Sequence, residues 1–262
     1  FLRRPMMRVT QLLLLLFFSP LFIAPACLAA EIQDRNIIEL SADLQIYPLT
    51  DDVWVHRSWA DIAGTRYPAN GLLINNDDTL VLIDTAWGND STASLLEWVT
   101  INFGKYPDVA VLTHAHADRI GGLPALAEHH IPAYVHPMTR ELAADQYPEE
   151  QLPEAISELK THSSARLEFL EVFYPGPAHS PDNIVVWYDN MKLLFGGCAV
   201  KSADAGDIHY VEGSSQEGWE AAIGKIQGRY PEATTVIPGH GAVGDAQLLD
   251  HTRKLARQGN QP

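Results

Sequence analysis

The chain has 262 residues, of which 46% are hydrophobic and 19% are charged. This composition can bury a large core, so it excludes collagen-like, disordered and multi-span membrane proteins. Its 18 basic and 33 acidic residues leave a formal net charge of −15, which argues against nucleic acid as a partner because a phosphate backbone attracts proteins mainly through lysine and arginine.

The first thirty residues are predicted to be a secretory signal peptide. Three arginines precede an apolar run over 12–18, and a stretch of mostly small residues follows over 24–30, with cleavage expected near Ala29 or Ala30. A serine–proline pair at 19–20 interrupts the apolar run, which is therefore too short to span a bilayer. No stable membrane insertion is expected after cleavage.

Removal of this segment leaves residues 31–262 as a single domain. Its fifteen basic and thirty-three acidic residues give a net charge of −18. We expect export to the periplasm as a monomer, with lipid attachment at Cys27 as the less favoured alternative and translation starting at Met6 or Met7. The remaining cysteine, Cys198, has no partner for an internal disulfide, so it is either buried and inert or used as a ligand or nucleophile.

The first half of this domain is predicted to begin with strands and continue into helices. Short β-branched and apolar runs alternate with turn signals such as 75–78, and Asp90 or Ser91 can cap the first helix. The expected elements are strands at 37–49, 53–56, 69–74 and 79–84, a helix at 89–103, a strand at 109–112, a helix at 121–129 and a strand at 133–135.

The second half repeats this order. The expected elements are strands at 166–174, 184–188 and 192–195, a helix at 219–229, a strand at 234–237 and a helix at 246–257. No low-complexity tract or Pro/Gly linker divides the chain. Strands followed by helices, twice, predict an α/β sandwich of two packed sheets with helices outside.

Candidate metal ligands follow the ends of several predicted strands. His114, His116 and Asp118 come directly after the strand at 109–112, where two imidazoles and a carboxylate can converge on metal ions. Alone, such a histidine pair is equally typical of an ordinary turn. Three further candidates occupy similar positions beside glycine or proline: His179, Cys198 and His240. Together, six zinc-compatible groups are expected at one edge of the sandwich.

These residues resemble the ligand set of the metallo-β-lactamases, specifically subclass B1. The spacings are 61 residues from Asp118 to His179, 19 to Cys198 and 42 to His240. The resemblance covers about 46–251 and implies a four-layer αββα sandwich of two mixed sheets with outer helices. Supporting segments lie at 83–88, 173–176, 182–186, 195–198 and 237–241.

The subclass assignment depends on two positions. The wider superfamily places a histidine directly after the aspartate, where this chain has Arg119, and Cys198 lies where subclass B1 supplies a cysteine instead. The mono-zinc subclass replaces the first histidine by asparagine, and His114 argues against it.

The resemblance implies two Zn²⁺ ions and hydrolysis of the β-lactam amide bond of penicillins, cephalosporins and carbapenems, which would confer antibiotic resistance. The first zinc would be held by His114, His116 and His179, and the second by Asp118, Cys198 and His240. Zinc can lower the pKa of a bound water to near neutrality and so supply a nucleophile without a serine. Asp118 is the candidate catalytic residue, because its carboxylate can orient that nucleophile.

The resemblance also suggests substrate-binding residues. Lys201, three residues after Cys198, matches the anchor for the substrate carboxylate. The segment 58–67 resembles a mobile flap, in which Trp59, Ile62 and Tyr67 either cover apolar parts of the substrate or simply pack. Trp87 has the same two interpretations.

Other residues near the expected site have open or supporting roles. Tyr210 lies where many members have an asparagine, and it either donates its hydroxyl to the lactam carbonyl or packs away. Arg119 is expected to pair with an acidic neighbour such as Asp84 and so orient the ligands of the second zinc. The other histidines are expected to be structural or exposed: His56, His129, His130, His136, His162, His209 and His251.

Three other functions remain open at this point. A thioester or lactone hydrolase could use the same fold, although Cys198 and Arg119 count against it. A non-catalytic periplasmic zinc-binding protein would need a closed site. A cysteine hydrolase using Cys198 with a histidine base would leave the other five groups without a role.

Overall fold

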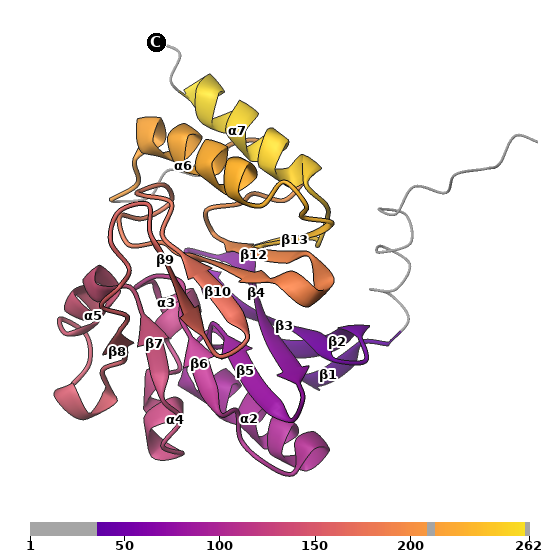
Figure 1. The fold of residues 1–262 in the computed structure, drawn as a ribbon. Helices are drawn as coiled ribbons and strands as arrows, with labels where there is room; N and C mark the ends of the chain where they lie inside the picture. The colour runs from indigo at the N-terminus through magenta and orange to yellow at the C-terminus, as the bar shows by residue number, and fades with distance from the viewer. Residues whose placement is uncertain (1–35, 209–212, 260–262) are drawn as a thin grey trace, which may run out of the picture.

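The computed structural model describes residues 36–208 and 213–259 (Figure 1). The predicted signal peptide, with Cys27, lies outside these residues, and so do His209 and Tyr210. Within the described residues, no helix has the length and apolar character needed to cross a membrane.

The first sheet has eight strands, paired in chain order from β1 to β8. Pairing is antiparallel from β1 to β5 and parallel from β5 to β8, so the sheet is mixed. The strands are β1 (Ile38–Ser41), β2 (Leu44–Thr50), β3 (Val53–Ile62), β4 (Thr65–Asn76), β5 (Thr79–Ile83), β6 (Val109–Val111), β7 (Ala133–Val135) and β8 (Glu154–Ala155).

The second sheet has five strands in the order β13-β12-β11-β10-β9. It is also mixed, because β12 and β13 are parallel and the other pairs are antiparallel. The strands are β9 (Ser164–Leu167), β10 (Leu170–Phe173), β11 (Val185–Tyr188), β12 (Leu193–Gly197) and β13 (Thr235–Pro238).

Helices cover the outer face of each sheet. In Figure 1, α6 and α7 lie side by side next to the second sheet, and α2 and α4 lie on the opposite side of the molecule. The helices are α2 (Asn89–Phe103), α3 (Ala117–Ile120), α4 (Leu123–Glu128), α5 (Pro137–Ala143), α6 (Gln216–Arg229) and α7 (Gln247–Gly259), and the 3₁₀ turns are η1 (Glu149–Gln151) and η2 (Asp189–Met191).

Strand periodicity explains the four layers. In β5, Leu80 and Leu82 pack in the core beneath the helices of the first sheet, whereas Val81 and Ile83 pack in the core between the sheets. Because successive strand side chains point to opposite faces, a continuously apolar strand must be covered on both sides. A third core joins the outer face of the second sheet to α6 and α7. The predicted αββα sandwich of two mixed sheets is confirmed.

Several predicted boundaries were wrong. The run at 37–49 is two strands joined by a turn at 42–43, and the run at 166–174 is a hairpin that turns at Glu168, whose φ is 51°. The helix expected at 121–129 is present as α4 (Leu123–Glu128), whereas α3, just before it, and α5 were not predicted. Neither hairpin turn contains glycine or proline, the strongest local turn signals, and Asp43 alone was too weak a signal to divide the first run.

Candidate metal centre

Most of the candidate ligands lie on loops that follow strands, and Asp118 lies in the first turn of α3. The loop after β6 carries His114 and His116, the residue after β12 is Cys198, and His240 follows β13. The pairs β5–β6 and β12–β13 are parallel, so within each sheet these loops emerge at the same edge. His179 lies between β10 and β11. Packing of the two sheets brings all these loops around one cavity.

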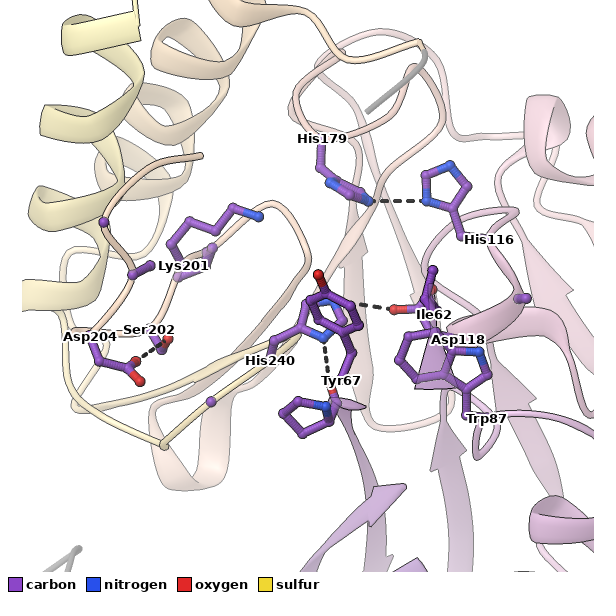
Figure 2. Close-up of a pocket in the computed structure, with 16 residues that line it drawn as sticks. Ile62, Tyr67, Trp87, His116, Asp118, His179, Lys201, Ser202, Asp204 and His240 are labelled. Carbon is purple, nitrogen blue, oxygen red and sulfur yellow. Dashed lines mark hydrogen bonds and ion pairs between the residues drawn. The ribbon is translucent and has the colours of Figure 1, made fainter. Parts of the chain in front are cut away.

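Three imidazoles converge at one side of the cavity. His116 Nδ1 lies 3.0 Å from His114 Nε2. It also lies 3.1 Å from His179 Nε2, a contact that Figure 2 shows. Burial, reinforced by neighbouring positive charge, holds the pKa of His114 and that of His179 well below the usual value. Both rings are therefore neutral at pH 7, the form that binds metals. Three ring nitrogens that face one point cannot all be satisfied by hydrogen bonds among themselves, so this donor set fits a single cation such as Zn²⁺.

Asp118, Cys198 and His240 form a second cluster. Cys198 Sγ lies 3.5 Å from Asp118 Oδ2 and 3.2 Å from His240 Nε2, and the last two atoms are 3.4 Å apart. His240 Nδ1 contacts the Pro68 carbonyl oxygen, which leaves Nε2 directed into the cluster. A carboxylate, a thiol and an imidazole suit a borderline-soft divalent ion.

The two clusters are adjacent. A ligand atom of His114 lies within 4.8 Å of those of Asp118 and Cys198, as well as of its partners in the first cluster. The structure therefore brings together all six residues that the sequence indicated as ligands, in the two groups of three that the resemblance implied. Two cations held here would be close neighbours and could act on one bound molecule.

Charge in the second cluster is set by burial and by Arg119. Burial raises the pKa of Cys198 to about 12, although the Arg119 guanidinium opposes this rise. Burial also opposes ionisation of Asp118, but Arg119 and His240 outweigh it and hold the Asp118 pKa below its usual value. The cluster thus offers one carboxylate and a thiol that a bound cation would deprotonate.

Arg119 is fully buried among acidic and carbonyl groups. Its Nη2 lies 2.8 Å from Asp118 Oδ2 and donates to Cys198 Sγ at 2.9 Å, and its Nη1 lies 3.2 Å from Asp84 Oδ2. Gly239 allows this close approach, because a Cβ there would lie 2.8 Å from Arg119 Nη2 and 2.6 Å from the Cys198 nitrogen. Arg119 therefore touches two candidate ligands from behind the cavity.

Asp84 supports this arrangement from the end of β5. Its backbone is left-handed, with φ 59°, and its carboxylate accepts hydrogen bonds from Thr113 N at 2.7 Å and Thr113 Oγ1 at 2.9 Å. Burial raises the pKa of Asp84 to about 7, against the effect of Arg119. Asp84 thus connects Thr113, at the start of the loop that carries His114 and His116, to Arg119.

The clusters open onto a cavity of about 750 Å³. Lys201, Trp87 and Tyr67 line this cavity, as does Ile62, so these predicted substrate contacts do meet there (Figure 2). Trp59 does not line it: its ring lies against Arg66, whose Cζ is 5.3 Å from the ring centroid. Trp59 and Ile62 both lie in β3, three positions apart, so their side chains face opposite sides of the strand. The comparison with a mobile flap did not take this alternation into account.

Two supporting residues were not assigned a role from the sequence. Asp182 is buried and accepts from Ala115 N at 2.9 Å, which fixes the peptide between His114 and His116. Its place just before an apolar strand could have indicated a buried acid that needs donors. The other is Trp219 on α6, whose Nε1 donates to the Ala199 carbonyl at 2.7 Å. No local pattern distinguishes it from an ordinary core residue.

Comparisons with known proteins agree with this geometry. A family model described as the metallo-beta-lactamase superfamily matches residues 64–240. A Bacillus sp. (strain 170) protein named metallo-beta-lactamase type 2 is 40% identical over 216 residues, which are 82% of this chain and 82% of that protein.

Solved structures are similar over nearly their whole length. A metallo-beta-lactamase from Pontibacter korlensis has a TM-score of 0.75 and 35% identity, over 83% of this chain and all of that one. The metallo-beta-lactamase FIM-1 from Pseudomonas aeruginosa, solved in a mono-zinc form, has a TM-score of 0.77 and 29% identity, over 86% of this chain and 99% of that one.

Proposed function

Because the chain belongs to the metallo-beta-lactamase superfamily, we propose that it is a zinc-dependent enzyme that hydrolyses the amide bond of β-lactams, including penicillins, cephalosporins and carbapenems. One observation carries this proposal: two adjacent clusters of three ligands open onto a cavity that also contains a buried lysine. The named activities of the relatives support it, and the mono-zinc form of FIM-1 supports zinc as the metal.

We assign the ligands in two groups. His114, His116 and His179 would hold the first zinc, and Asp118, Cys198 and His240 the second. Bound zinc supplies two kinds of chemistry at such sites, since it lowers the pKa of water and stabilises negative charge that develops on the substrate.

Asp118 is the proposed catalytic residue. Its low pKa keeps the carboxylate ionised, so it can accept a hydrogen bond from the attacking water and hold that water toward the lactam carbonyl. Arg119 keeps this carboxylate in place at 2.8 Å and does not line the cavity itself. Asp84 pairs with the other terminal nitrogen of Arg119, Nη1.

Lys201 is the proposed anchor for the substrate carboxylate. Its side chain is buried at the cavity wall (Figure 2), and a cation in such a site attracts an anionic ligand more strongly than a solvated one. The chain carries a net charge of −15, so an anionic substrate needs this local positive group. Trp87, Ile62 and Tyr67 would cover the apolar parts of the ligand, and Tyr210, which lies outside the described residues, is proposed to contact it as well.

Hydrolysis assays with a chelator test the proposal. Zinc-loaded protein should hydrolyse a carbapenem and show little activity on a monobactam, and chelation should abolish turnover until zinc is restored. A cysteine hydrolase would keep its activity after chelation, and a zinc-storage protein would show none at any stage. An intact carbapenem after incubation with zinc-replete protein would contradict the proposal.

We also propose that residues 1–30 direct export to the periplasm and are then removed, leaving a monomeric domain of residues 31–262. Export can be tested by comparing the mass and compartment of the expressed protein with those of a variant lacking residues 1–30. Accumulation of the full-length chain in the cytoplasm would contradict it.

A further inference from the structure

Trp219 contacts the Lys201 anchor but takes no part in the function described so far. It lies on α6 and is fully buried. The Lys201 Nζ atom lies 5.0 Å from the centroid of its ring. The same indole meets the His179 ring edge-on, with the two ring centroids 5.7 Å apart and an interplanar angle of 73°.

The indole also holds the backbone that carries the lysine. Trp219 Nε1 donates to the Ala199 carbonyl at 2.7 Å, and Ala199 lies between Cys198 and Lys201 in the chain. The backbone nitrogen of Lys201 donates to Thr252 Oγ1 on α7 at 2.9 Å. Both ends of this short segment are therefore tied to the outer helices.

The start of α6 is fastened to the His179 loop. Ser214 Oγ donates to the His179 carbonyl at 2.7 Å, and the Ser215 nitrogen donates to the Ala178 carbonyl at 2.8 Å. Ser215 then caps the helix by accepting from Gly218 N at 3.0 Å. Trp219 thus projects from a helix end whose position relative to His179 is set by two hydrogen bonds.

We propose that Trp219 is a positioning residue for substrate binding: its ring holds the Lys201 ammonium at the cavity wall beside His179, ready to receive the carboxylate of the substrate. This inference rests on the proposed function. A lysine side chain has several freely rotating bonds and loses much conformational entropy when it binds a ligand. An aromatic face attracts the ammonium, most strongly where water is excluded, so the lysine is ordered before the substrate arrives.

Ordinary core packing is the competing explanation, and a double-mutant cycle separates the two. Trp219→Leu should raise KM for a β-lactam about tenfold and change kcat less than about threefold, since the ground-state anchor is what is lost. In a Lys201→Ala background the same change should alter KM less than about twofold. An equal fold-change in both backgrounds would overturn the proposal.

Two further variants control for folding. Trp219→Phe keeps a ring but loses the bond to Ala199, and it should raise KM about two- to threefold. Trp187 is another buried tryptophan of the same core, stacked on Tyr230 with ring centroids 4.9 Å apart. Trp187→Leu should lower the melting temperature and leave KM unchanged. If it raises KM as much as Trp219→Leu, the effect is one of stability and the proposal is wrong.

A spectroscopic test does not depend on turnover. In protein labelled with ¹³C-lysine, the ε-methylene protons of Lys201 should be shifted upfield by the ring current of Trp219, with or without zinc, and Trp219→Leu should abolish the shift. Absence of the shift in the parent protein would overturn the proposal. A clear shift in a protein that hydrolyses no β-lactam would instead contradict the proposed function and leave the Trp219–Lys201 pairing intact.

Discussion

Arg119 is the residue on which the second cluster most depends. It is fully buried and lies within 3.2 Å of acceptor atoms on Asp84, Asp118 and Cys198. A buried ion pair adds little net stability, but removal of one partner leaves uncompensated charge in the interior. Arginine suits this position because its planar fork can donate to several acceptors at once.

Arg119→Met should therefore destabilise the metal-free protein by roughly 3–5 kcal/mol. Arg119→Lys retains the charge but loses the fork, so its loss should be smaller. Urea unfolding monitored by circular dichroism measures both changes. Unchanged unfolding midpoints for the methionine variant would show that the carboxylates are neutral or hydrated instead of paired.

Cys198→Ser should weaken the second metal site more than the first. A serine hydroxyl binds zinc poorly compared with a thiolate, whereas the three imidazoles of the other cluster are untouched. Titration of metal-free protein with zinc should show one tight site and one weakened site. His116→Ala is the matched control, which should weaken the other site first. Equal loss at both sites in the serine variant would contradict the assignment of ligands.

At the scale of elements, the hairpin of β3 and β4 extends beyond the sheet toward the cavity. The pairing continues without interruption from Val53–Ile74 to Ile62–Thr65, so the segment 58–67 is regular antiparallel structure. Its tip bears Ile62 and Tyr67, whose exposed fractions are 49% and 40%. Apolar side chains that remain this exposed contribute little to folding and are available to a ligand.

Replacement of Ile62 and Tyr67 by serine should raise KM for β-lactams several-fold and shift the unfolding free energy by less than about 0.5 kcal/mol. KM is expected to change more than the unfolding free energy because the apolar surface of these side chains becomes buried only when a ligand binds. Steady-state kinetics and thermal unfolding of the double variant test this together. A large loss of stability with an unchanged KM would show that the tip has a structural role instead.

At the scale of the whole molecule, buried histidines make the stability of the metal-free protein dependent on pH. Burial lowers the pKa of His56 and of His240 to about 4 and holds those of His114 and His179 well below the usual value. Between pH 6.5 and 4 the unfolded chain therefore binds more protons than the folded chain, so stability falls as the pH falls. The raised pKa of Asp84, about 7, acts in the opposite direction, but one carboxyl is outweighed by four imidazoles.

We expect metal-free protein to lose on the order of 5 kcal/mol of folding free energy between pH 7 and pH 5. Denaturant unfolding at several pH values measures this slope. Among the described residues, the recorded hydrogen bond of His56 Nε2 is to the Asp84 carbonyl oxygen and not to a candidate ligand. His56→Gln should therefore make the slope shallower and leave zinc binding intact. A slope identical to that of the parent protein would show that His56 is not protonated on unfolding in this range.

The amino-acid sequence alone indicated an α/β sandwich of two packed sheets, because strand periodicity and turn composition are local properties, and its resemblance to a known family implied the αββα order of layers. It also indicated the six candidate ligands, since each one lies within a few residues of the end of a predicted strand. The positions of Lys201 and Trp87 at the cavity agree with what the resemblance implied. The short strands β1 and β9 were merged with their neighbours, because their turns contain neither glycine nor proline.

Only the tertiary structure decided which side chains meet across distant segments. The contact of Arg119 with Cys198 spans 79 residues and depends on the packing of one sheet against the other. The exclusion of Trp59 from the cavity follows from which face of β3 is turned inward, and the indole of Trp219 reaches Lys201 because α6 docks on the second sheet. These contacts are set by the register and packing of whole elements, and a pattern of a few neighbouring residues carries no information about them.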